Sequence, residues 1–417
     1  MCRIWIKDAI EMTHVYLLNE GSRAAIYGIG TYIRQMTECL QNIPFLSLHT
    51  VNLFSERKEF LIEKTDGIET IDIPSIQPAS TIHSERYYRH AWYLIVSSIH
   101  IEQDDSLIFH LNYYEEYLLV AGIKKVYPQS RIYFTVHYQD WCFLLLGNTS
   151  YFRKIIHQDK NILKTDKEKS VYASYEKELR LFNEVDKIIC LSQYTKSLLR
   201  EEYRMPEEKL LFIPNGLKDE YIPRSSEKRL AIKRNLYFKD DEKIVLFVGR
   251  LDEVKGVDLL IKAFEQVSES VPCHLVIVGD GHYESCLKAA ENYWYRMTFT
   301  GRLTKEALYP FYQIADVGVM PSFHEQCSYV AMEMMMFDVP LIVSTTTGLK
   351  EMVEDDDSKI EIEEHDETVA LSVERLAEII RRKLTQKSVG SRDTYIERYE
   401  IKNMECNYME LYQHRTI

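Results

Sequence analysis

The sequence predicts an α/β protein of two doubly wound, Rossmann-like domains with parallel sheets. The chain has 417 residues, which is too long for one ordinary hydrophobic core and suits two domains of roughly 150–220 residues each. Its 46% hydrophobic and 28% charged residues are ordinary for a globular protein. Short apolar runs alternate with amphipathic stretches in two successive series, and strands that alternate with helices indicate parallel sheets.

The first series occupies the N-terminal half. It starts with a strand at Thr13–Leu18, then a glycine-containing loop and a helix at Thr31–Asn42. Further strands are predicted at Leu46–Phe54, Leu107–Leu111, Arg131–Val136, Lys187–Leu191 and Lys209–Ile213. The predicted helices between them are Glu85–Ser98, Glu116–Val126, Tyr172–Phe182 and Tyr194–Tyr203.

A polar stretch at Pro223–Lys228 interrupts the alternation and is typical of an interdomain linker. The second series has strands at Lys243–Val248, His274–Val278, Met297–Thr300, Val317–Met320 and Pro340–Val343, and helices at Val257–Val267, Lys305–Ile314 and Tyr329–Phe337. The aromatic tail Arg392–Tyr412 has helical spacing, and such tails pack across a domain boundary. We therefore predict domains at residues 1–222 and 223–391, with residues 392–417 crossing back to the first.

Two segments fall outside this pattern. Eleven residues precede Met12, and they are either an upstream start or an extra packed element. The acidic stretch Glu351–Glu367 is predicted to be mostly solvated loop and strand edge. Its Asp355–Asp357 triplet superficially matches a D-x-D metal motif, but no ligand constellation surrounds it.

The net charge argues against one class of partner, and the cysteines and apolar runs indicate where the protein is located. A net charge of −13 argues against a nucleic-acid partner, because neutralising phosphates needs clustered Lys and Arg. A local basic group is predicted to be a solvated face, and it comprises Arg86, Arg89, Lys124, Lys125 and Arg131. The eight cysteines form no C-x-x-C pair, and no apolar run reaches 18 residues. These features predict a cytoplasmic protein and leave peripheral contact with the inner membrane face open.

A pair of basic residues follows the first strand of the second series. Gly249–Arg250–Leu251 ends this strand, and Lys255–Gly256 follows at the start of a helix. Open α/β sheets bind ligands at this junction. Arg250 and Lys255 can both reach one site, and two cations beside a helix N-terminus suit a diphosphate.

Two glutamates form the second candidate cluster. Glu325 lies in the loop after the strand Val317–Met320, and Glu333 lies in the next helix among Met332, Met334, Met335 and Met336. A carboxylate in such an apolar helix needs a partner, which a ribose diol would supply. A solvent-facing Glu333 is the alternative.

Four blocks in this order resemble the retaining GT-B glycosyltransferases of family 4, the glycosyl transferases group 1 type. They are Gly249-Arg250-Leu251 with Lys255-Gly256, then Val278-Gly279-Asp280-Gly281, Phe299-Thr300-Gly301-Arg302-Leu303, and Pro321-Ser322 with Glu325-x7-Glu333. The resemblance is strong in the C-terminal half and weak in the N-terminal half. It implies a GT-B fold, in which the two sheets face each other across a cleft.

The resemblance also implies roles for individual residues. Arg250 and Lys255 would bind the donor diphosphate and stabilise it as leaving group, while Glu325 would face the donor sugar and Glu333 the ribose. Backbone around Leu303 would contact the base, and backbone at Ser328 and Tyr329 the distal phosphate. The family usually has Gly-Leu or Gly-Ile where this chain has Ser328-Tyr329.

The N-terminal half supplies weaker candidates. Gly28-Ile29-Gly30-Thr31 resembles the family's glycine loop, which approaches the donor phosphates from across the cleft, so Gly28 and Gly30 are predicted donor contacts. His137 ends a strand where the family often has a histidine that contacts the donor sugar, and a structural strand-end histidine is the alternative. His110 and Asn112 end a neighbouring strand and are predicted on the acceptor side. Pro214-Asn215-Gly216 resembles the family's hinge loop or is a tight turn.

The resemblance implies a retaining transfer of a hexose-type sugar from a UDP- or GDP-linked donor to an acceptor hydroxyl. The predicted catalytic groups are Glu325, His137, Arg250 and Lys255. No metal and no cofactor is expected, because the basic residues and a helix N-terminus stabilise the diphosphate. The acceptor stays open between saccharide, lipid-linked sugar, peptide and small molecule. The competing interpretations are an inactive binding subunit of this type and a GT-B epimerase or phosphorylase.

Overall fold

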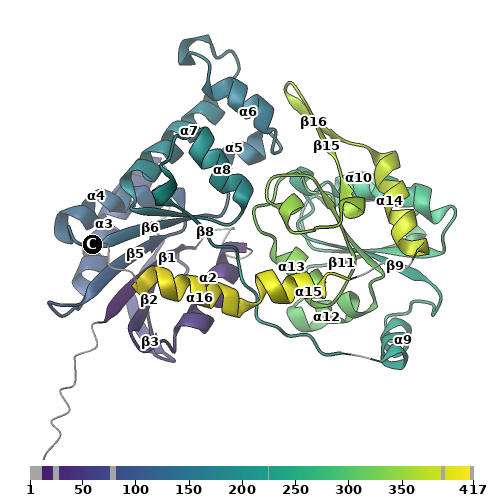
Figure 1. The fold of residues 1–417 in the computed structure, drawn as a ribbon, viewed down its shortest axis with the longest axis horizontal. Helices are drawn as coiled ribbons and strands as arrows, with labels where there is room; N and C mark the ends of the chain where they lie inside the picture. The colour runs from purple at the N-terminus through teal and green to yellow at the C-terminus, as the bar shows by residue number, and fades with distance from the viewer. Residues whose placement is uncertain (1–11, 22–27, 76–80, 224, 387–389, 414–417) are drawn as a thin grey trace, which may run out of the picture.

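The computed structural model describes residues 12–21, 28–75, 81–223, 225–386 and 390–413, with the side chains of 81–84 excepted. The leading segment 1–11 lies outside the described residues, so the two interpretations of it stay open. Figure 1 shows two lobes, one for each series of strands and helices. We call them the N-lobe and the C-lobe. The fold is the two-lobed α/β architecture that the sequence predicts.

The N-lobe is built on an eight-stranded sheet of order β3-β4-β2-β1-β5-β6-β7-β8. Its strands are β1 (Thr13–Glu20), β2 (Leu46–Ser55), β3 (Leu61–Thr65), β4 (Ile68–Pro74), β5 (Ser106–Leu111), β6 (Arg131–Val136), β7 (Lys187–Cys190) and β8 (Leu210–Phe212). The central strands are nearly continuous apolar runs because helices cover both faces of the sheet.

The N-lobe helices are α2 (Gly28–Leu40), α3 (Thr81–Ser98), α4 (Tyr117–Val126), α5 (Asp140–Leu144), α6 (Thr149–Ile156), α7 (Asp166–Glu184) and α8 (Gln193–Glu201). Helix α2 buries Ile29, Tyr32, Ile33, Met36 and Leu40 at helical spacing against the sheet. It begins at the carboxyl end of β1, which is the edge where open α/β sheets hold ligands.

The C-lobe is built on a six-stranded parallel sheet of order β11-β10-β9-β12-β13-β14. Its strands are β9 (Lys243–Val248), β10 (Cys273–Val278), β11 (Met297–Gly301), β12 (Val317–Met320), β13 (Leu341–Ser344) and β14 (Lys359–Ile360). The helices are α9 (Ser226–Asn235), α10 (Val257–Ser268), α11 (Tyr283–Ala289), α12 (Lys305–Ile314), α13 (Tyr329–Met336) and α14 (Val373–Thr385).

Two sequence expectations need correction, and a third gains detail. The N-lobe sheet is not wholly parallel, because β3 pairs antiparallel with β4 as a hairpin at the sheet edge. The predicted linker Pro223–Lys228 already includes the start of α9, where the Ser225 side chain caps the helix by accepting from Lys228 N. The acidic stretch, predicted to be mostly solvated loop and strand edge, contains the edge strand β14 and also the exposed strand β15 (Ile362–His365), which forms an antiparallel hairpin with β16 (Thr368–Leu371).

The end of the chain crosses from the C-lobe to the N-lobe. Helix α15 (Arg392–Thr394) lies on the C-lobe, and α16 (Ile401–Gln413) packs against α2 of the N-lobe (Figure 1). Tyr408 of α16 hydrogen-bonds to Tyr32 of α2 through their hydroxyls at 2.7 Å. These buried contacts explain why the aromatic spacing of the tail predicts a helix that packs across the boundary.

The lobes also contact each other where C-lobe carboxylates accept hydrogen bonds from the first N–H groups of two N-lobe helices. The Glu351 carboxylate of the C-lobe accepts from Gln193 N (2.8 Å) and Tyr194 N (2.6 Å) at the start of α8. The Glu364 carboxylate, on β15, accepts from Thr149 N (3.1 Å) and Ser150 N (3.0 Å) at the start of α6. A carboxylate at a helix N-terminus satisfies free N–H groups and favours the helix dipole. Asn148 and Ser192 cap these helices from within the N-lobe, and the C-lobe carboxylates satisfy further free N–H groups at the same helix ends.

Candidate functional site

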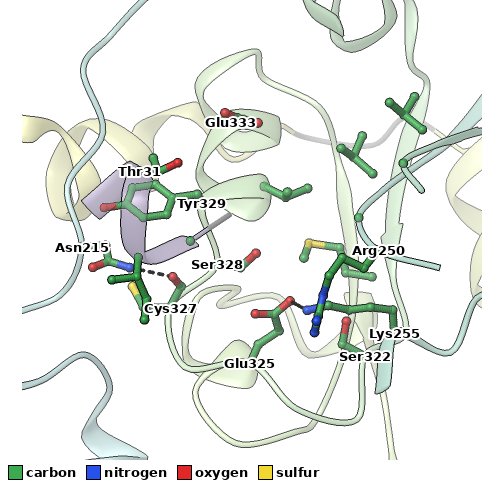
Figure 2. A pocket seen from close by; sticks show the side chains of 18 of the residues that line it. Thr31, Asn215, Arg250, Lys255, Ser322, Glu325, Cys327, Ser328, Tyr329 and Glu333 are labelled. Atoms are coloured by element: carbon green, nitrogen blue, oxygen red, sulfur yellow. Dashed lines mark hydrogen bonds and ion pairs between the residues drawn. The ribbon is translucent and has the colours of Figure 1, made fainter. Parts of the chain in front are cut away.

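A cavity of about 900 Å³ lies between the lobes. It is lined by the loops at the carboxyl ends of the C-lobe strands and by the start of α2 on the facing lobe. Figure 2 shows Arg250, Lys255, Glu325 and Glu333 around it on the C-lobe side, with Thr31 and Asn215 opposite. A cleft of this size at the carboxyl edge of a parallel sheet is the usual ligand site of such folds.

Backbone hydrogen bonds hold the C-lobe loops together. Gly249 N donates to Val278 O at 2.9 Å, and Leu251 N donates to Asp280 O at 2.8 Å. Gly279 has φ of +145°, and a Cβ there would stand 1.7 Å from Gly249 O. Only glycine permits this approach. The loop that carries Arg250 is therefore fixed against the next loop.

Lys255 and Glu325 form an ion pair on the C-lobe wall of the cavity. The Lys255 amino group contacts the Glu325 carboxylate, and the two side chains are only 15% and 17% exposed. Their loops meet because Phe323 N donates to Val254 O at 2.7 Å. Gly256 has φ of +63°, and a Cβ there would lie 2.5 Å from Pro321 O. The structure thus brings together two residues that are 70 positions apart.

Arg250 lies beside this pair and is itself neutralised by an acid. Its guanidinium is 3.2 Å from the Asp252 carboxylate, and both side chains are partly buried. Asp252 lies in the same loop, so the salt bridge holds the Arg250 side chain near the cavity wall. The two basic groups predicted from the sequence thus line one cavity, each with an acidic neighbour.

Glu333 lines the other end of the cavity on helix α13. The Tyr312 hydroxyl donates to its carboxylate at 2.7 Å. Burial raises the pKa of Glu333, and the hydrogen bond from Tyr312 opposes this shift only in part. The side chain is half-buried and faces the cavity, which does not fit the alternative of a fully solvent-facing Glu333. Its environment favours a neutral, multiply hydroxylated partner.

Ser328 and Tyr329 stand where the family that the sequence resembles usually has Gly-Leu or Gly-Ile, and they lie at the start of α13. Ser328 caps the helix by accepting from Ala331 N at 3.4 Å, and its own N–H donates to Met352 Sδ at 3.3 Å. Tyr329 follows and packs against apolar residues of both lobes. Leu303 also lines the cavity. Because the Ser328 amide is already engaged, any phosphate contact here falls to the later amides of the first turn.

On the N-lobe side, His137 lines the cavity next to Tyr138. Its Nε2 is 2.9 Å from Asn112 Oδ1, and the ring of Tyr32 packs edge-on against it. Burial lowers the pKa of His137 to about 3, with a smaller contribution from His110. His137 is therefore a neutral imidazole that donates Nε2–H to Asn112 and keeps Nδ1 as an acceptor.

Of the other N-lobe candidates, some line the cavity and others do not. Gly28 lines the cavity, whereas Gly30 is not among its lining residues and its donor contact stays a prediction. Asn112 is buried and positions His137 rather than facing an acceptor. His110 is fully buried, with Thr135 Oγ1 at 2.7 Å and the Tyr412 hydroxyl at 2.7 Å. The expectation that His110 lines the acceptor side is therefore wrong, because α16 covers it.

Several lining residues were not predicted from the sequence, and three of them carry basic or imidazole side chains. Arg34 reaches the cavity from the exposed face of α2, and Lys305 from the start of α12. His324 is buried beside Glu325, its Nδ1 has no hydrogen-bond partner, and burial lowers its pKa to about 3. No motif marks these side chains, because helical position and domain packing bring them to the cleft. The alternation of buried and exposed positions along α2 is the one usable signal for Arg34.

The lining has more basic than acidic side chains. The basic residues are Arg34, Arg250, Lys255, Arg302 and Lys305, and the acidic ones are Asp280, Glu325 and Glu333. This surplus of positive charge, with the start of α13 beside it, suits an anion that also offers hydroxyl groups. Within the described ranges, no three His, Cys, Asp or Glu side chains are placed to hold a metal ion. The described helices also include none that is long and apolar enough to span a bilayer.

Family models match both halves of the chain. Residues 26–221 match the model described as Glycosyltransferase Family 4, and residues 228–394 match Glycosyl transferases group 1. An uncharacterised glycosyltransferase of Methanocaldococcus jannaschii is 34% identical over 174 residues, which is 40% of this chain and 44% of that protein. The α-D-kanosaminyltransferase of Streptomyces kanamyceticus is 28% identical over 172 residues, covering 40% and 45% of the two chains. The match thus spans less than half the length of these relatives.

Solved structures share the fold along nearly the whole chain. Sucrose-phosphate synthase from Thermosynechococcus elongatus superposes with a TM-score of 0.73 at 19% identity, covering 96% of this chain and 98% of that one. HepE of Anabaena, solved with UDP and glucose, superposes with a TM-score of 0.67 at 13% identity, covering 96% and 99%. At these identities the superpositions establish the fold.

Proposed function

The chain belongs to the GT-B glycosyltransferases of family 4, and from this premise we propose that it transfers a hexose-type sugar from a nucleoside diphosphate to an acceptor hydroxyl. The reaction breaks the bond between the anomeric carbon and the diphosphate and forms a bond to the acceptor oxygen. The acceptor proton passes to the departing phosphate. We propose retention of configuration by front-face displacement, in keeping with the family resemblance.

The observation that carries this proposal is the placement of Lys255 and Arg250 on one cavity wall, with Glu325 in contact with Lys255. In transfer from a nucleoside diphosphate the negative charge grows on the leaving diphosphate. Fixed basic groups in a partly buried site stabilise that charge without reorganising. Glu325 would then leave Lys255 for the hydroxyls of the donor sugar, while the diphosphate takes its place.

We assign each remaining group of the cavity to a different part of the bound donor. Glu333 would accept hydrogen bonds from the ribose hydroxyls, which offset the desolvation of its carboxylate. Neutral His137, held by Asn112, would contact the sugar from the N-lobe. Backbone at Leu303 would meet the base, and amides at the start of α13 the distal phosphate. Because Gly28 and Arg34 line the cavity from the other lobe, a bound donor would connect the two lobes.

We further propose that the reaction needs no divalent ion, since Lys255, Arg250 and the helix start supply the required positive charge. UDP- and GDP-linked sugars are the donor candidates, and the UDP complex of HepE favours testing UDP first. The acceptor, whether saccharide, lipid-linked sugar, peptide or small molecule, would enter beside the N-lobe wall. The cysteines of the described residues are free, which fits a cytoplasmic enzyme with peripheral membrane contact left open.

A thermal-shift screen of nucleotide sugars tests the donor assignment, because a ligand that binds only the folded state raises the melting temperature. One nucleotide family should raise it, and the Lys255→Ala variant should lose the shift. A donor-hydrolysis assay then tests for catalysis. Slow release of free nucleoside diphosphate supports an enzyme, whereas binding with no release under any acceptor condition would support an inactive binding subunit instead. Phosphate-dependent formation of a sugar phosphate would indicate a phosphorylase, and conversion of the donor to its epimer an epimerase.

A further inference from the structure

A second cavity, of about 420 Å³, lies in the C-lobe away from the cleft. Lys243 is the first residue of β9, Asp316 immediately precedes β12, and Pro340 immediately precedes β13. All three line this cavity. It therefore opens at the amino edge of the C-lobe sheet, whereas Arg250, Lys255 and Glu325 follow the carboxyl ends of the strands. The two cavities lie at opposite edges of one sheet.

One carboxylate at this edge is shared by three cations. Asp316 lies 3.7 Å from the Arg229 guanidinium, 3.3 Å from the Lys243 amino group and 3.8 Å from the Lys233 amino group. Its carboxylate also accepts from Ile244 N at 2.9 Å. One negative charge cannot balance three positive ones, so the cluster keeps a positive surplus. In a chain with a net charge of −13 this local excess stands out.

The exposed members of the cluster face the cavity. The side chains of Arg229 and Lys243 are each 43% exposed and line it, whereas Lys233 is 8% exposed beneath them. Asp338 is the other acid in the lining, and its carboxylate accepts from Arg392 N at 3.3 Å. One terminal nitrogen of Arg229 already donates to Ile314 O at 3.1 Å and Ala315 O at 2.8 Å. An anion that enters from solvent would meet the exposed part of this guanidinium and the Lys243 amino group.

Part of the lining is aromatic. Tyr312 and Phe337 stack at 5.5 Å between ring centroids, and Tyr221 meets Phe337 edge-on at 5.9 Å. Tyr312 lines this cavity while its hydroxyl holds Glu333 of the donor cleft. An occupant would therefore lie against the residue that positions the ribose carboxylate.

From this charge, volume and lining we propose that the cavity is an anion site for a phosphate monoester of a small molecule. Its phosphate group would pair with Arg229 and Lys243, and its organic part would face the aromatic part of the lining. This assignment does not depend on the reaction at the cleft. Inorganic phosphate is the minimal probe, and ribose 5-phosphate tests whether an organic part adds affinity.

Calorimetric titration of the full chain with each probe tests the proposal. Lys243→Gln should weaken binding roughly tenfold, the size of one charge-assisted hydrogen bond. Lys239→Gln makes the same charge change at an exposed position outside the cavity and should bind like the unaltered protein. Melting temperatures of both variants show whether each is folded.

A variant in the cleft separates the two anion sites. Lys255→Ala should keep the phosphate binding that Lys243→Gln loses, because Lys255 lines only the cleft cavity. The proposal is overturned if the unaltered protein binds neither probe, or if Lys243→Gln binds as tightly as the unaltered protein. Loss of binding in Lys255→Ala alone would place the anion at the donor diphosphate position and overturn it as well.

Discussion

Replacing Lys255 by alanine tests the centre of the proposed mechanism. In the structure Lys255 contacts the Glu325 carboxylate, and both side chains are less than one-fifth exposed. The substitution removes the positive charge that would face the diphosphate. It also leaves the Glu325 carboxylate without its partner on the wall where an anion must bind. Both effects oppose binding and departure of the diphosphate.

The size of the effect follows from the loss of one charge-stabilising group in a partly buried site. Such losses cost about 2.7–4 kcal/mol in the transition state, so kcat/KM should fall roughly 10²–10³-fold. The free energy of unfolding should fall by about 1–3 kcal/mol, because a partly buried acceptor loses its donor. Glu325→Gln should act differently. It frees Lys255 for the anion, so nucleoside diphosphate should bind more tightly while sugar transfer falls.

Donor hydrolysis over a range of nucleotide-sugar concentrations measures kcat/KM, and titration with the nucleoside diphosphate measures its binding. Lys262→Ala is a matched control, since Lys262 is an exposed lysine on the adjoining helix α10. Unchanged kcat/KM in Lys255→Ala would refute the assignment of Lys255 to the leaving group. Weaker nucleotide binding in Glu325→Gln would show that Glu325 does not compete with the diphosphate for Lys255.

Further predictions concern the rest of the cleft and its closure. Arg250→Ala should lower kcat/KM roughly 10²–10³-fold, and steady-state kinetics with full activity would remove it from the site. Burial raises the pKa of Glu333, so its carboxylate becomes protonated at a higher pH than an exposed glutamate. KM for the donor should therefore rise as pH falls through that pKa, and Glu333→Gln should flatten the KM profile; an unaltered profile would contradict the ribose role. Incubation with EDTA should leave transfer intact, and its abolition in metal-free buffer would refute metal independence. Glu351→Ala and Glu364→Ala should each weaken the interlobe caps by about 1 kcal/mol and enlarge the radius of gyration in small-angle scattering. Glu363→Ala, on the same hairpin without a cap, should not change the radius.

Much of the fold could be predicted because its signals are local. Strands such as Arg131–Val136 and Val317–Met320 are short apolar runs, and their expected bounds agree with β6 and β12. The edge hairpin β3–β4 escaped prediction because its strands are half-exposed and carry charges, which leaves no apolar run to detect. The start of α9 was predicted as linker for a related reason, since its helix is polar on nearly all faces.

The same holds for the site: residues marked by their neighbours in the sequence could be predicted, whereas contacts with distant segments could not. Arg250, Lys255, Glu325 and Glu333 could be chosen from the sequence because strand–loop–helix junctions mark where a parallel sheet binds ligands. Sequence spacing also suggested His110, since it ends a strand beside His137. That prediction failed because α16, about 300 residues later in the chain, covers His110, and the Tyr412 hydroxyl of α16 hydrogen-bonds to the His110 imidazole.

The sequence by itself predicts the order of strands and helices, the sheet edge where a ligand is expected and the basic and acidic residues at that edge, because each depends on residues close in sequence. The pairing of Lys255 with Glu325, the entry of Arg34 and His137 from the other lobe and the capping of α6 and α8 across the cleft are tertiary facts. The entry of residues from the other lobe and the capping across the lobes arise only when the two sheets face each other, whereas the Lys255–Glu325 pair forms where two loops of the C-lobe meet. In each case tertiary packing decides which side chains come together, because they are far apart in the sequence.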